Sequence, residues 1–258
     1  MPSIGFDCLM CGAPITGVDD DARGDAFVAH VRAAHPELPY PDVLIRNVAA
    51  AIVRQTGPVD RLDTLGAVEI HPVTEERIDD WLAFFDHDAF SDSPIFGASC
   101  YCTEPHVLDP KNFDPRHEPS TWQENRALVA GLLRDGGSFG YLAYVDGRAA
   151  GWVNASMRKD YALFRRGLGA EPTDEQVVGI SCFVIAPPYR RHGLAGRLLD
   201  RAVADAADRG ATSVESYPFN DERTEDSRNF RGPRSFYEAH GFTVVKARER
   251  DTVMRRTV

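Results

Sequence analysis

The chain has 258 residues, enough for one main domain and an appendage, and its 43% hydrophobic and 26% charged residues are typical of an ordinary globular protein. Its formal net charge of −10 argues against broad affinity for nucleic acid or anionic membranes, because binding to phosphate groups depends mainly on Lys and Arg. It has no run of about 18 apolar residues and does not begin with the basic and apolar regions of a signal peptide, so we expect a cytoplasmic protein.

Residues 1–37 differ in pattern from the rest of the chain. They contain Cys8-x2-Cys11, an acidic loop and a short predicted helix, "DAFVAHVRAAH", that carries His30 and His35. Two thiols and two imidazoles in this order resemble a C2H2-like zinc finger, although the 18 residues between Cys11 and His30 exceed the usual interval of roughly 12 to 15. A segment this small has little core of its own, so a structural zinc would supply most of its folding energy. We therefore predict a zinc-finger-like module over residues 1–37.

The role of this module is open between several alternatives. The chain has five cysteines, an odd count that disfavours a disulfide framework, and the thiols and histidines of the module could also be unconnected. The predicted helix carries a single Arg and follows an acidic loop. A structural role, or contact with a protein partner, is therefore a better prediction than base reading in DNA.

Residues 38–66 are predicted to be a helical linker. In "PDVLIRNVAAAIVRQTG" the apolar residues recur at helical spacing, and Gly57 is placed where it could end the helix. The linker leads into a longer region, residues 67–258, in which strands and helices alternate.

The first part of that region contains one strand and two helices. "AVEIHPV" alternates like a strand, and Thr74 then opens a helix with its apolar residues on one face. Thr121 and Glu124 form a capping box at the start of a second helix, which a pair of glycines ends. The long irregular stretch between these helices is predicted to be a pocket wall or a lid.

The second part begins with a hairpin. "FGYLAYVDGRAAGWVNAS" turns at Asp146-Gly147 in the manner of a type I′ turn. "VVGISCFVIA" is a nearly continuous apolar strand of the kind that is buried on both faces. A helix over residues 193–210, the strand "TSVESYP", the helix "PRSFYEAHG" and two strands, "FTVVKAR" and "DTVMRRTV", complete the prediction.

The turn that follows the buried strand gathers positive charge in an acidic protein. Arg190, Arg191 and His192 stand directly before Gly193 in "YRRHGLAGRLL". The first N–H groups of a helix lack intrahelical partners and lie at the positive end of the helix dipole, so this position favours an anion. Gly193 has no side chain and lets the backbone approach a ligand closely. A diphosphate fits these requirements.

Two motifs at this end of the chain point to a known family. Arg190, Gly193 and Ala195 form R-x-x-G-x-A after a buried strand, which resembles the acetyl-CoA signature of the GCN5-related N-acetyltransferase (GNAT) family. "FYEAHGF" is similar to the family's second motif, in which a tyrosine four residues before Gly-Phe acts as general acid, here Tyr237. The resemblance implies an α/β fold over residues 67–258, with a mixed, mostly antiparallel central sheet flanked by helices.

The same resemblance implies the reaction and assigns parts of the site. An acetyl group is expected to pass from acetyl-CoA to a primary amine of a small molecule or peptide, by direct attack in a ternary complex. A backbone N–H of the buried strand would polarise the thioester carbonyl, the strand would pair with the pantetheine arm, and Tyr237 would protonate the departing thiolate. The predicted cofactor-binding residues are Phe183, Val184, Ile185, Arg190, Arg191, His192, Gly193, Leu194, Ala195 and Asn229.

The general base is the first point at which this chain departs from the family's pattern. An alkyl amine has a pKa of about 10 and must lose a proton before it attacks. Many family members place a Glu on or beside the buried strand, where this chain has Ser181 and Cys182. Glu215 on the next strand is our predicted base, with Glu104 and Asp88 as rivals; the alternative interpretation of Glu215 is a solvated strand residue.

A second departure concerns the contact with CoA near the tyrosine. The family's Asn seven residues before the tyrosine is replaced here by Phe230. The neighbouring Asn229 or Arg231 could take over that contact.

The remaining cysteines each allow two interpretations. Cys182 could accept the acetyl group covalently, but a buried Cys on an apolar strand more often packs as a small hydrophobe. Cys100 and Cys102, with His106 close by, could bind a second zinc, but thiols that line a pocket or pack in a core are the better prediction.

A protein of another class also fits part of the pattern. In that alternative the chain is a non-catalytic regulatory module, which senses acetyl-CoA and contacts a protein partner through the zinc finger. Tyr237 favours the enzyme, whereas the missing strand carboxylate favours the regulatory module.

Overall fold

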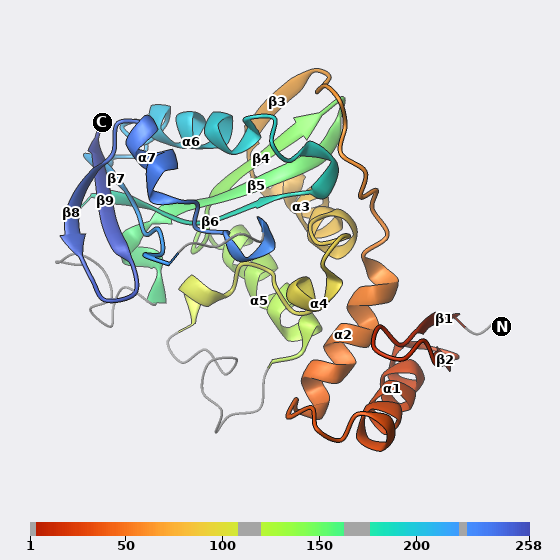
Figure 1. Cartoon of the computed structure of the whole chain (residues 1–258). Coiled ribbons are helices and arrows are strands. Elements are labelled where there is room, and N and C mark those ends of the chain that lie inside the picture. Colours follow the sequence, from red (N-terminus) through yellow and green to blue (C-terminus); the bar gives the residue numbers. More distant parts are fainter. Residues whose placement is uncertain (1–3, 108–119, 163–175, 222–225) are drawn as a thin grey trace.

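The structure, a computed structural model, describes residues 4–107, 120–162, 176–221 and 226–258 (Figure 1). An N-terminal part with a two-stranded sheet lies beside a larger part that is built on a seven-stranded sheet. The N-terminal elements are β1 Ile4–Asp7, β2 Pro14–Gly17, α1 Asp20–Ala34 and α2 Asp42–Arg54.

The N-terminal part folds around a small apolar core. β1 and β2 form an antiparallel hairpin, and the Asp19 side chain caps α1 by accepting a hydrogen bond from the Ala22 N–H at 2.8 Å. The core consists of Cys8, Ile15, Phe27, Val31, Ile45 and Ala49. The last two residues belong to α2, so this helix completes the core of the module rather than merely linking it to the next domain.

The predicted helix of the linker is present, but it ends earlier than expected. α2 stops at Arg54 with Gln55 as its C-cap, whereas Gly57 lies beyond the helix and donates its backbone N–H to the carbonyl of His87 at 2.8 Å. Gly57 is therefore a point of contact with the second part of the chain and not a helix terminator.

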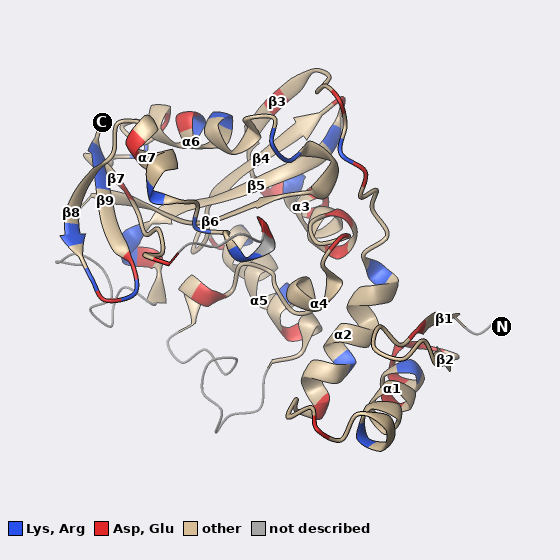
Figure 2. Cartoon of the chain, viewed as in Figure 1, with Lys and Arg blue, Asp and Glu red and all other residues tan. Residues whose placement is uncertain are grey.

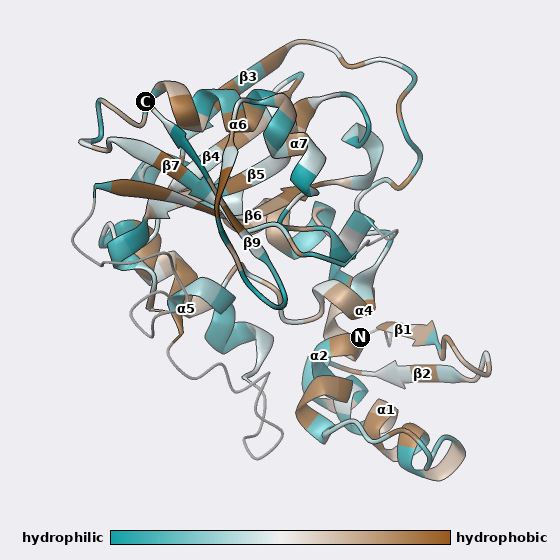
Figure 3. Cartoon of the chain, turned by 60° about the vertical axis from the view of Figure 1, so that its left-hand side comes forward, coloured by the Kyte–Doolittle hydropathy of each residue, from teal (hydrophilic) through white to brown (hydrophobic). Residues whose placement is uncertain are grey.

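Side chains of α2 and of its C-cap residue also form hydrogen bonds with the larger part of the molecule. The Asn47 amide donates to the Ser120 carbonyl and accepts from the Trp122 N–H, both at 3.0 Å. The buried Gln55 side chain likewise donates to the Phe85 carbonyl at 2.6 Å. Figure 3 shows both hydrophobic and hydrophilic residues along this helix, next to α1. The helix is thus shared by the two parts of the molecule.

The seven-stranded sheet confirms the predicted α/β fold with a mixed, mostly antiparallel sheet. Its strand order is β3-β4-β5-β6-β7-β9-β8, and β6 and β7 are parallel whereas the other neighbours are antiparallel. The strands are β3 Val68–Pro72, β4 Gly140–Val145, β5 Arg148–Met157, β6 Val177–Ile185, β7 Ser213–Ser216, β8 Thr243–Ala247 and β9 Thr252–Thr257.

Helices cover both faces of this sheet (Figure 1). One face carries α3 Ile78–Ala83, the π-helical turn η2 Phe84–Asp88, α4 Pro94–Gly97 and α5 Trp122–Arg134; the other carries α6 Leu194–Ala204 and α7 Arg234–Ala239. The main core lies between these layers and the sheet, and its largest fully buried side chains include Trp81 and Trp152.

Local signals in the sequence account for several boundaries. The capping box of Thr121 and Glu124 is present at the start of α5, and Asp146 and Gly147 adopt positive φ angles of 49° and 80°, as a type I′ hairpin turn requires. The helix predicted over residues 193–210 is shorter, because α6 ends at Ala204 and turns lead from there to Gly210, whose φ is 79°.

Candidate functional site

The turn between β6 and α6 presents free backbone donors to open space. Gly193 is the N-cap residue of α6 with a left-handed φ of 75°, and no side chain caps the helix. Arg191 also has a positive φ, 66°. A Cβ built on Gly193 would meet no atom within 4 Å. The uncapped N-terminus of α6 therefore has the charge and the room that an anionic ligand requires.

The three basic side chains of this turn are bonded to other parts of the chain. Arg190 donates from Nε to the Ile185 carbonyl at 2.9 Å and forms an ion pair with Asp92 at 2.5 Å. Arg191 pairs with Asp226, and a ring nitrogen of His192 contacts the Leu62 carbonyl at 2.8 Å. These side chains therefore have partners within the chain, whereas the backbone at Gly193 faces open space.

Beyond Ile180 the edge of β6 diverges from its parallel neighbour. The pairing of β6 with β7 ends at Ile180 and Ser216, although β6 continues to Ile185, and the chain after β7 bonds toward β9 through Thr252 N–H and the Pro218 carbonyl at 2.9 Å. Residues 181–185 of β6 are thus no longer paired with β7. The interval between these residues and the chain that follows Ser216 is here named the wedge. Phe183, Val184 and Ile185, which the resemblance assigns to the pantetheine arm, lie on the β6 side of the wedge.

On its other side β6 carries a register shift opposite Asn154 and Ala155. Asn154 pairs with Cys182 and Ala155 with Ile180, so Ser181 is an extra residue in β6. Such a bulge re-aims the backbone groups near it and is common beside active sites.

Tyr237 lies near Cys182 of β6. Its side chain is fully buried, and its hydroxyl donates to the Arg231 carbonyl at 2.6 Å. Burial raises the pKa of the Tyr237 phenol, and the nearby Cys182 thiol adds to this effect. The phenol is therefore protonated at neutral pH, which is the state that a proton donor needs.

Glu215 does not fit the base role that we predict from the sequence. It pairs with Gly179, in the closed part of the β6–β7 ladder, and its side chain is 0% exposed. Its carboxylate accepts hydrogen bonds from Arg158 at 3.1 Å and Arg255 at 2.6 Å, and from the Tyr217 hydroxyl at 3.0 Å. A carboxylate held by two guanidinium groups, away from the wedge, is a structural element of the sheet.

Replacing Glu215 with Gln is expected to cost about 3 to 5 kcal/mol of unfolding free energy, because the Arg158 guanidinium, 3% exposed, would lose its buried ion pair with this carboxylate. Urea unfolding of the variant measures this loss. Glu69→Gln is the control, since the Glu69 side chain is 71% exposed, and it should be nearly neutral. If the Glu215 variant unfolds like the wild type but turns over at least about 100-fold more slowly, Glu215 is a base after all.

Comparison of the sequence with known protein families gives one match. The model of the acetyltransferase (GNAT) family matches residues 102–242, more than half of the 258-residue chain. This chain belongs to the GNAT family. It is accordingly an acyltransferase, and acetyl-CoA is its co-substrate.

Several solved structures are similar to this GNAT protein at low sequence identity. An N-acetyltransferase from Staphylococcus aureus Mu50 is 13% identical, with 74% of this chain and 99% of that one covered and a TM-score of 0.44. The PaiA N-acetyltransferase from Thermoplasma acidophilum, in complex with coenzyme A, is 15% identical, with 74% and 99% covered and a TM-score of 0.44. The family assignment rests on the family model and not on these likenesses. No curated protein sequence matches the chain.

One contact of the GNAT domain was not foreseen from the sequence. The Phe183 N–H, on the open edge of β6, donates to the Phe230 carbonyl at 2.6 Å. Asn229 belongs to the same segment, where its carbonyl accepts from the Gly232 N–H at 2.9 Å. The replacement of the family's Asn by Phe230 was the available signal that this segment is unusual.

The four predicted zinc ligands come together in the N-terminal part. The ligand atoms of Cys8, Cys11, His30 and His35 all lie within 4.8 Å of one another. The Cys11 Sγ is 3.3 Å from His30 Nε2, and the Cys8 Sγ is 3.7 Å from His35 Nε2. Two thiols from the hairpin and two imidazoles from the end of α1 are a ligand set that suits zinc.

Cys100, Cys102 and His106 show no comparable arrangement. Within residues 4–107, 120–162, 176–221 and 226–258, the N-terminal group is the one set of clustered metal-ligand atoms. The amide of Asn154 contacts Cys102 Sγ at 3.4 Å and His106 Nε2 at 3.2 Å. Burial lowers the pKa of His106 to about 4, so this ring is neutral. These side chains pack on the α5 side of β5 and β6, as the core interpretation predicts.

Cys182 is unsuited to a covalent role in this arrangement. A hydrogen bond with the Cys102 thiol and burial of the Cys182 side chain together raise the pKa of Cys182 well above the ordinary value. A thiol that keeps its proton at neutral pH is a poor nucleophile.

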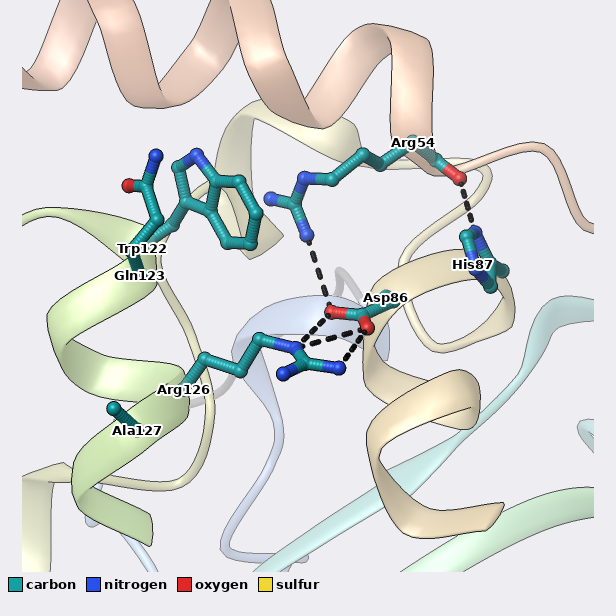
Figure 4. A pocket seen from close by; sticks show the side chains of 7 residues that line it. All are labelled: Arg54, Asp86, His87, Trp122, Gln123, Arg126 and Ala127. Atoms are coloured by element: carbon teal, nitrogen blue, oxygen red, sulfur yellow. Dashed lines mark hydrogen bonds and ion pairs between the residues drawn. The ribbon is translucent and has the colours of Figure 1, made fainter. Parts of the chain in front are cut away.

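A separate hollow of about 280 Å³ lies where α2 meets the GNAT domain (Figure 4). Asp86 in η2 binds Arg54 at 3.5 Å and Arg126 at 2.9 Å, and the Arg54 guanidinium lies 3.9 Å from the ring centre of Trp122. The lining residues are Arg54, Asp86, His87, Trp122, Gln123, Arg126 and Ala127. None of them is a predicted site residue, and the ion pairs fasten α2 to the domain.

Proposed function

We propose that this chain transfers an acetyl group from acetyl-CoA to a primary amine of a small molecule or peptide, by direct attack of the amine on the thioester. The uncapped N-terminus of α6, which begins at Gly193 after the turn that follows β6, is the observation that carries the proposal. Its N–H groups would bind the diphosphate of acetyl-CoA, and residues 183–185 along the wedge would bind the pantetheine arm. Both assignments agree with the family to which the chain belongs.

Tyr237 is proposed to protonate the departing CoA thiolate. Its buried phenol lies beside Cys182 in the splayed part of β6, and its raised pKa keeps the proton on the oxygen. The incoming amine must be neutral when it attacks. The two arginines that hold the Glu215 carboxylate argue against Glu215 as the group that deprotonates the amine.

Release of free thiol from acetyl-CoA over a panel of amines tests the proposal. We expect release that depends on both the amine and the enzyme. Release at the same rate with no amine present would show a hydrolase instead, and binding of CoA without any release would show a sensor.

Replacing Tyr237 with Phe is expected to lower kcat by about 10- to 100-fold, because a thiolate is a fairly stable leaving group and needs only partial help from an acid. The Kd of CoA should change little. Since the pKa of Tyr237 is raised, wild-type kcat should show no loss through this phenol up to about pH 10. Tyr144→Phe is the matched control, as it removes an exposed hydroxyl that bonds to Asp80, and it should leave kcat unchanged. An equal fall in both variants would contradict the acid role.

We further propose that Cys8, Cys11, His30 and His35 hold a structural zinc ion. All four positions are filled, so the metal has no open coordination site for catalysis and serves to hold the hairpin against α1. Figure 2 shows acidic as well as basic residues on α1, and Asp20 and Asp21 lie in its first turn. This charge pattern favours a structural or protein-contact role over DNA binding.

Localisation in the cytoplasm remains an expectation from the sequence. In the described part of the chain, no helix has both the length and the apolar content that crossing a bilayer needs.

A further inference from the structure

Residues 226–232, here named the latch segment, contact both sides of the wedge, that is, β6 and the chain that follows β7. The Phe230 carbonyl accepts the Phe183 N–H of β6 at 2.6 Å. The Phe230 ring packs edge-on against Phe219, with 5.5 Å between ring centres, and Phe219 lies just beyond the end of β7. The latch segment therefore bridges the opening along which the pantetheine arm would lie.

Arg231 fixes this segment from both sides. Its guanidinium pairs with Glu104 at 3.1 Å and with Asp251 at 3.2 Å, and it lies 4.5 Å from the ring centre of Phe219. The Arg231 side chain is 13% exposed, so these ion pairs are partly shielded from water. Its carbonyl also accepts the Tyr237 hydroxyl, as described above.

A third contact joins the latch segment to the turn before α6. The Asp226 carboxylate pairs with Arg191, next to the backbone donors that would bind the diphosphate. Both side chains are more exposed than that of Arg231, so this pair is the weakest of the three contacts. It nevertheless places a negative group beside the position that a diphosphate would take.

These contacts compete with acetyl-CoA for the same groups. An N–H that is bonded to the Phe230 carbonyl is not available to the thioester or the pantetheine arm, since a single N–H makes one good hydrogen bond. In the same way, the Tyr237 proton cannot pass to a thiolate while it is held by the Arg231 carbonyl. We propose that the latch segment blocks the acetyl-CoA groove of the resting chain, and that acetyl-CoA binds when this segment moves out. This inference rests on the proposed function.

Because Arg231 makes two ion pairs that hold the latch segment, we expect it to set the fraction of molecules in which this segment covers the groove. The apparent Kd of a ligand is its intrinsic Kd divided by the fraction of molecules that are open. If about one molecule in ten is open, a change that releases the segment strengthens binding about tenfold.

The first test compares CoA binding by calorimetry in the wild-type chain and in Arg231→Met. The variant keeps an apolar side chain of similar length but loses both ion pairs, and its Kd should be about tenfold lower. Asp251→Asn, which removes one partner from a different segment, should lower the Kd by a smaller factor. Arg234→Met is the matched control, because Arg234 pairs with Glu238 on the surface of α7, and its Kd should match the wild type.

The second test follows trypsin cleavage of the full-length wild-type chain with and without CoA. Displacement of the latch segment should speed cleavage after Arg231, whereas a ligand that leaves the segment closed should slow it or leave it unchanged. Asp251→Asn keeps Arg231, so the same digestion of this variant, together with thermal melts of both variants, separates a released segment from a misfolded chain.

The outcomes distinguish this inference from the proposed function. If CoA binds to the wild type but Arg231→Met and Asp251→Asn bind it equally or more weakly, the latch is wrong and the proposed function stands. Slower cleavage after Arg231 in the presence of CoA leads to the same conclusion. If folded wild-type and variant chains all fail to take up CoA, the proposed function itself is wrong.

Discussion

Replacing Gly193 with Asp is expected to raise the Kd of CoA at least about 100-fold, because a juxtaposed like charge costs several kcal/mol and about 1.4 kcal/mol corresponds to a factor of ten. The new side chain would enter the open space in front of the uncapped α6 N-terminus, where a Cβ meets nothing within 4 Å. Its carboxylate would occupy the donors meant for the diphosphate and would repel it. Calorimetric titration of the variant with CoA measures the effect.

Gly210→Asp is a closely matched control for this change. Gly210 has a φ of 79° against 75° for Gly193, and a Cβ at either position would meet no atom within 4 Å. Both variants therefore introduce the same charge with the same backbone strain, but Gly210 follows the far end of α6. CoA affinity should be unchanged in Gly210→Asp. If both variants bind CoA like the wild type, the turn at Gly193 does not hold the diphosphate.

Loss of the proposed zinc ion should unfold the N-terminal part, because binding of a structural zinc contributes about 10 to 16 kcal/mol in small zinc modules and the core formed by the described residues here has six buried side chains. Removal of the metal with a chelator should abolish the hydrogen-exchange protection of α1 and of the β1–β2 hairpin. Cys11→Ser should have the same effect and should reduce the zinc content of the purified chain from about one equivalent to about one tenth or less.

Cys11 suits this experiment because it is exposed, so its replacement removes a ligand without opening a cavity in the core. Cys100→Ser, a change of the same kind in the other part of the chain, should retain the metal. A wild-type chain with less than about half an equivalent of zinc, or a Cys11→Ser chain with unchanged exchange, would argue against the four-ligand site.

The sequence was most informative where a local signal decides the structure. The capping box at Thr121, the Asp146-Gly147 turn and the apolar run of β6 act over a few residues, and each appears as predicted. The grouping of Cys8, Cys11, His30 and His35 was likewise predicted, from the resemblance of their pattern to a zinc finger, although the interval between the two pairs is longer than usual.

The sequence was less informative where a side chain's role depends on distant partners. Glu215 looks like a strand carboxylate beside the site, but its environment is set by Arg158, 57 residues away, and by Arg255, 40 residues away. The same reason explains the side chains of Arg190 and Arg191, whose acidic partners come from other segments. No spacing rule predicts which of the chain's many carboxylates will meet a given arginine.

The early end of α2 also depends on partners that are distant in the sequence. Gly57 has the right residue type for a helix stop, but the chain leaves the helix at Gln55, whose buried side chain bonds to the carbonyls of Phe85 and Asp86 at 2.6 and 3.1 Å. A tertiary contact thus outweighs a local preference.

The position of α2 has a consequence for any attempt to divide this protein. Cut after residue 37, the fragment with the four clustered Cys and His residues would lose Ile45 and Ala49 and leave Phe27 and Val31 facing water. Begun at residue 67, the acetyltransferase fragment would leave the Trp122 N–H without Asn47 and the Phe85 carbonyl without Gln55. Either half, expressed without this helix, should therefore be prone to aggregation, and the smallest separable unit on each side includes it.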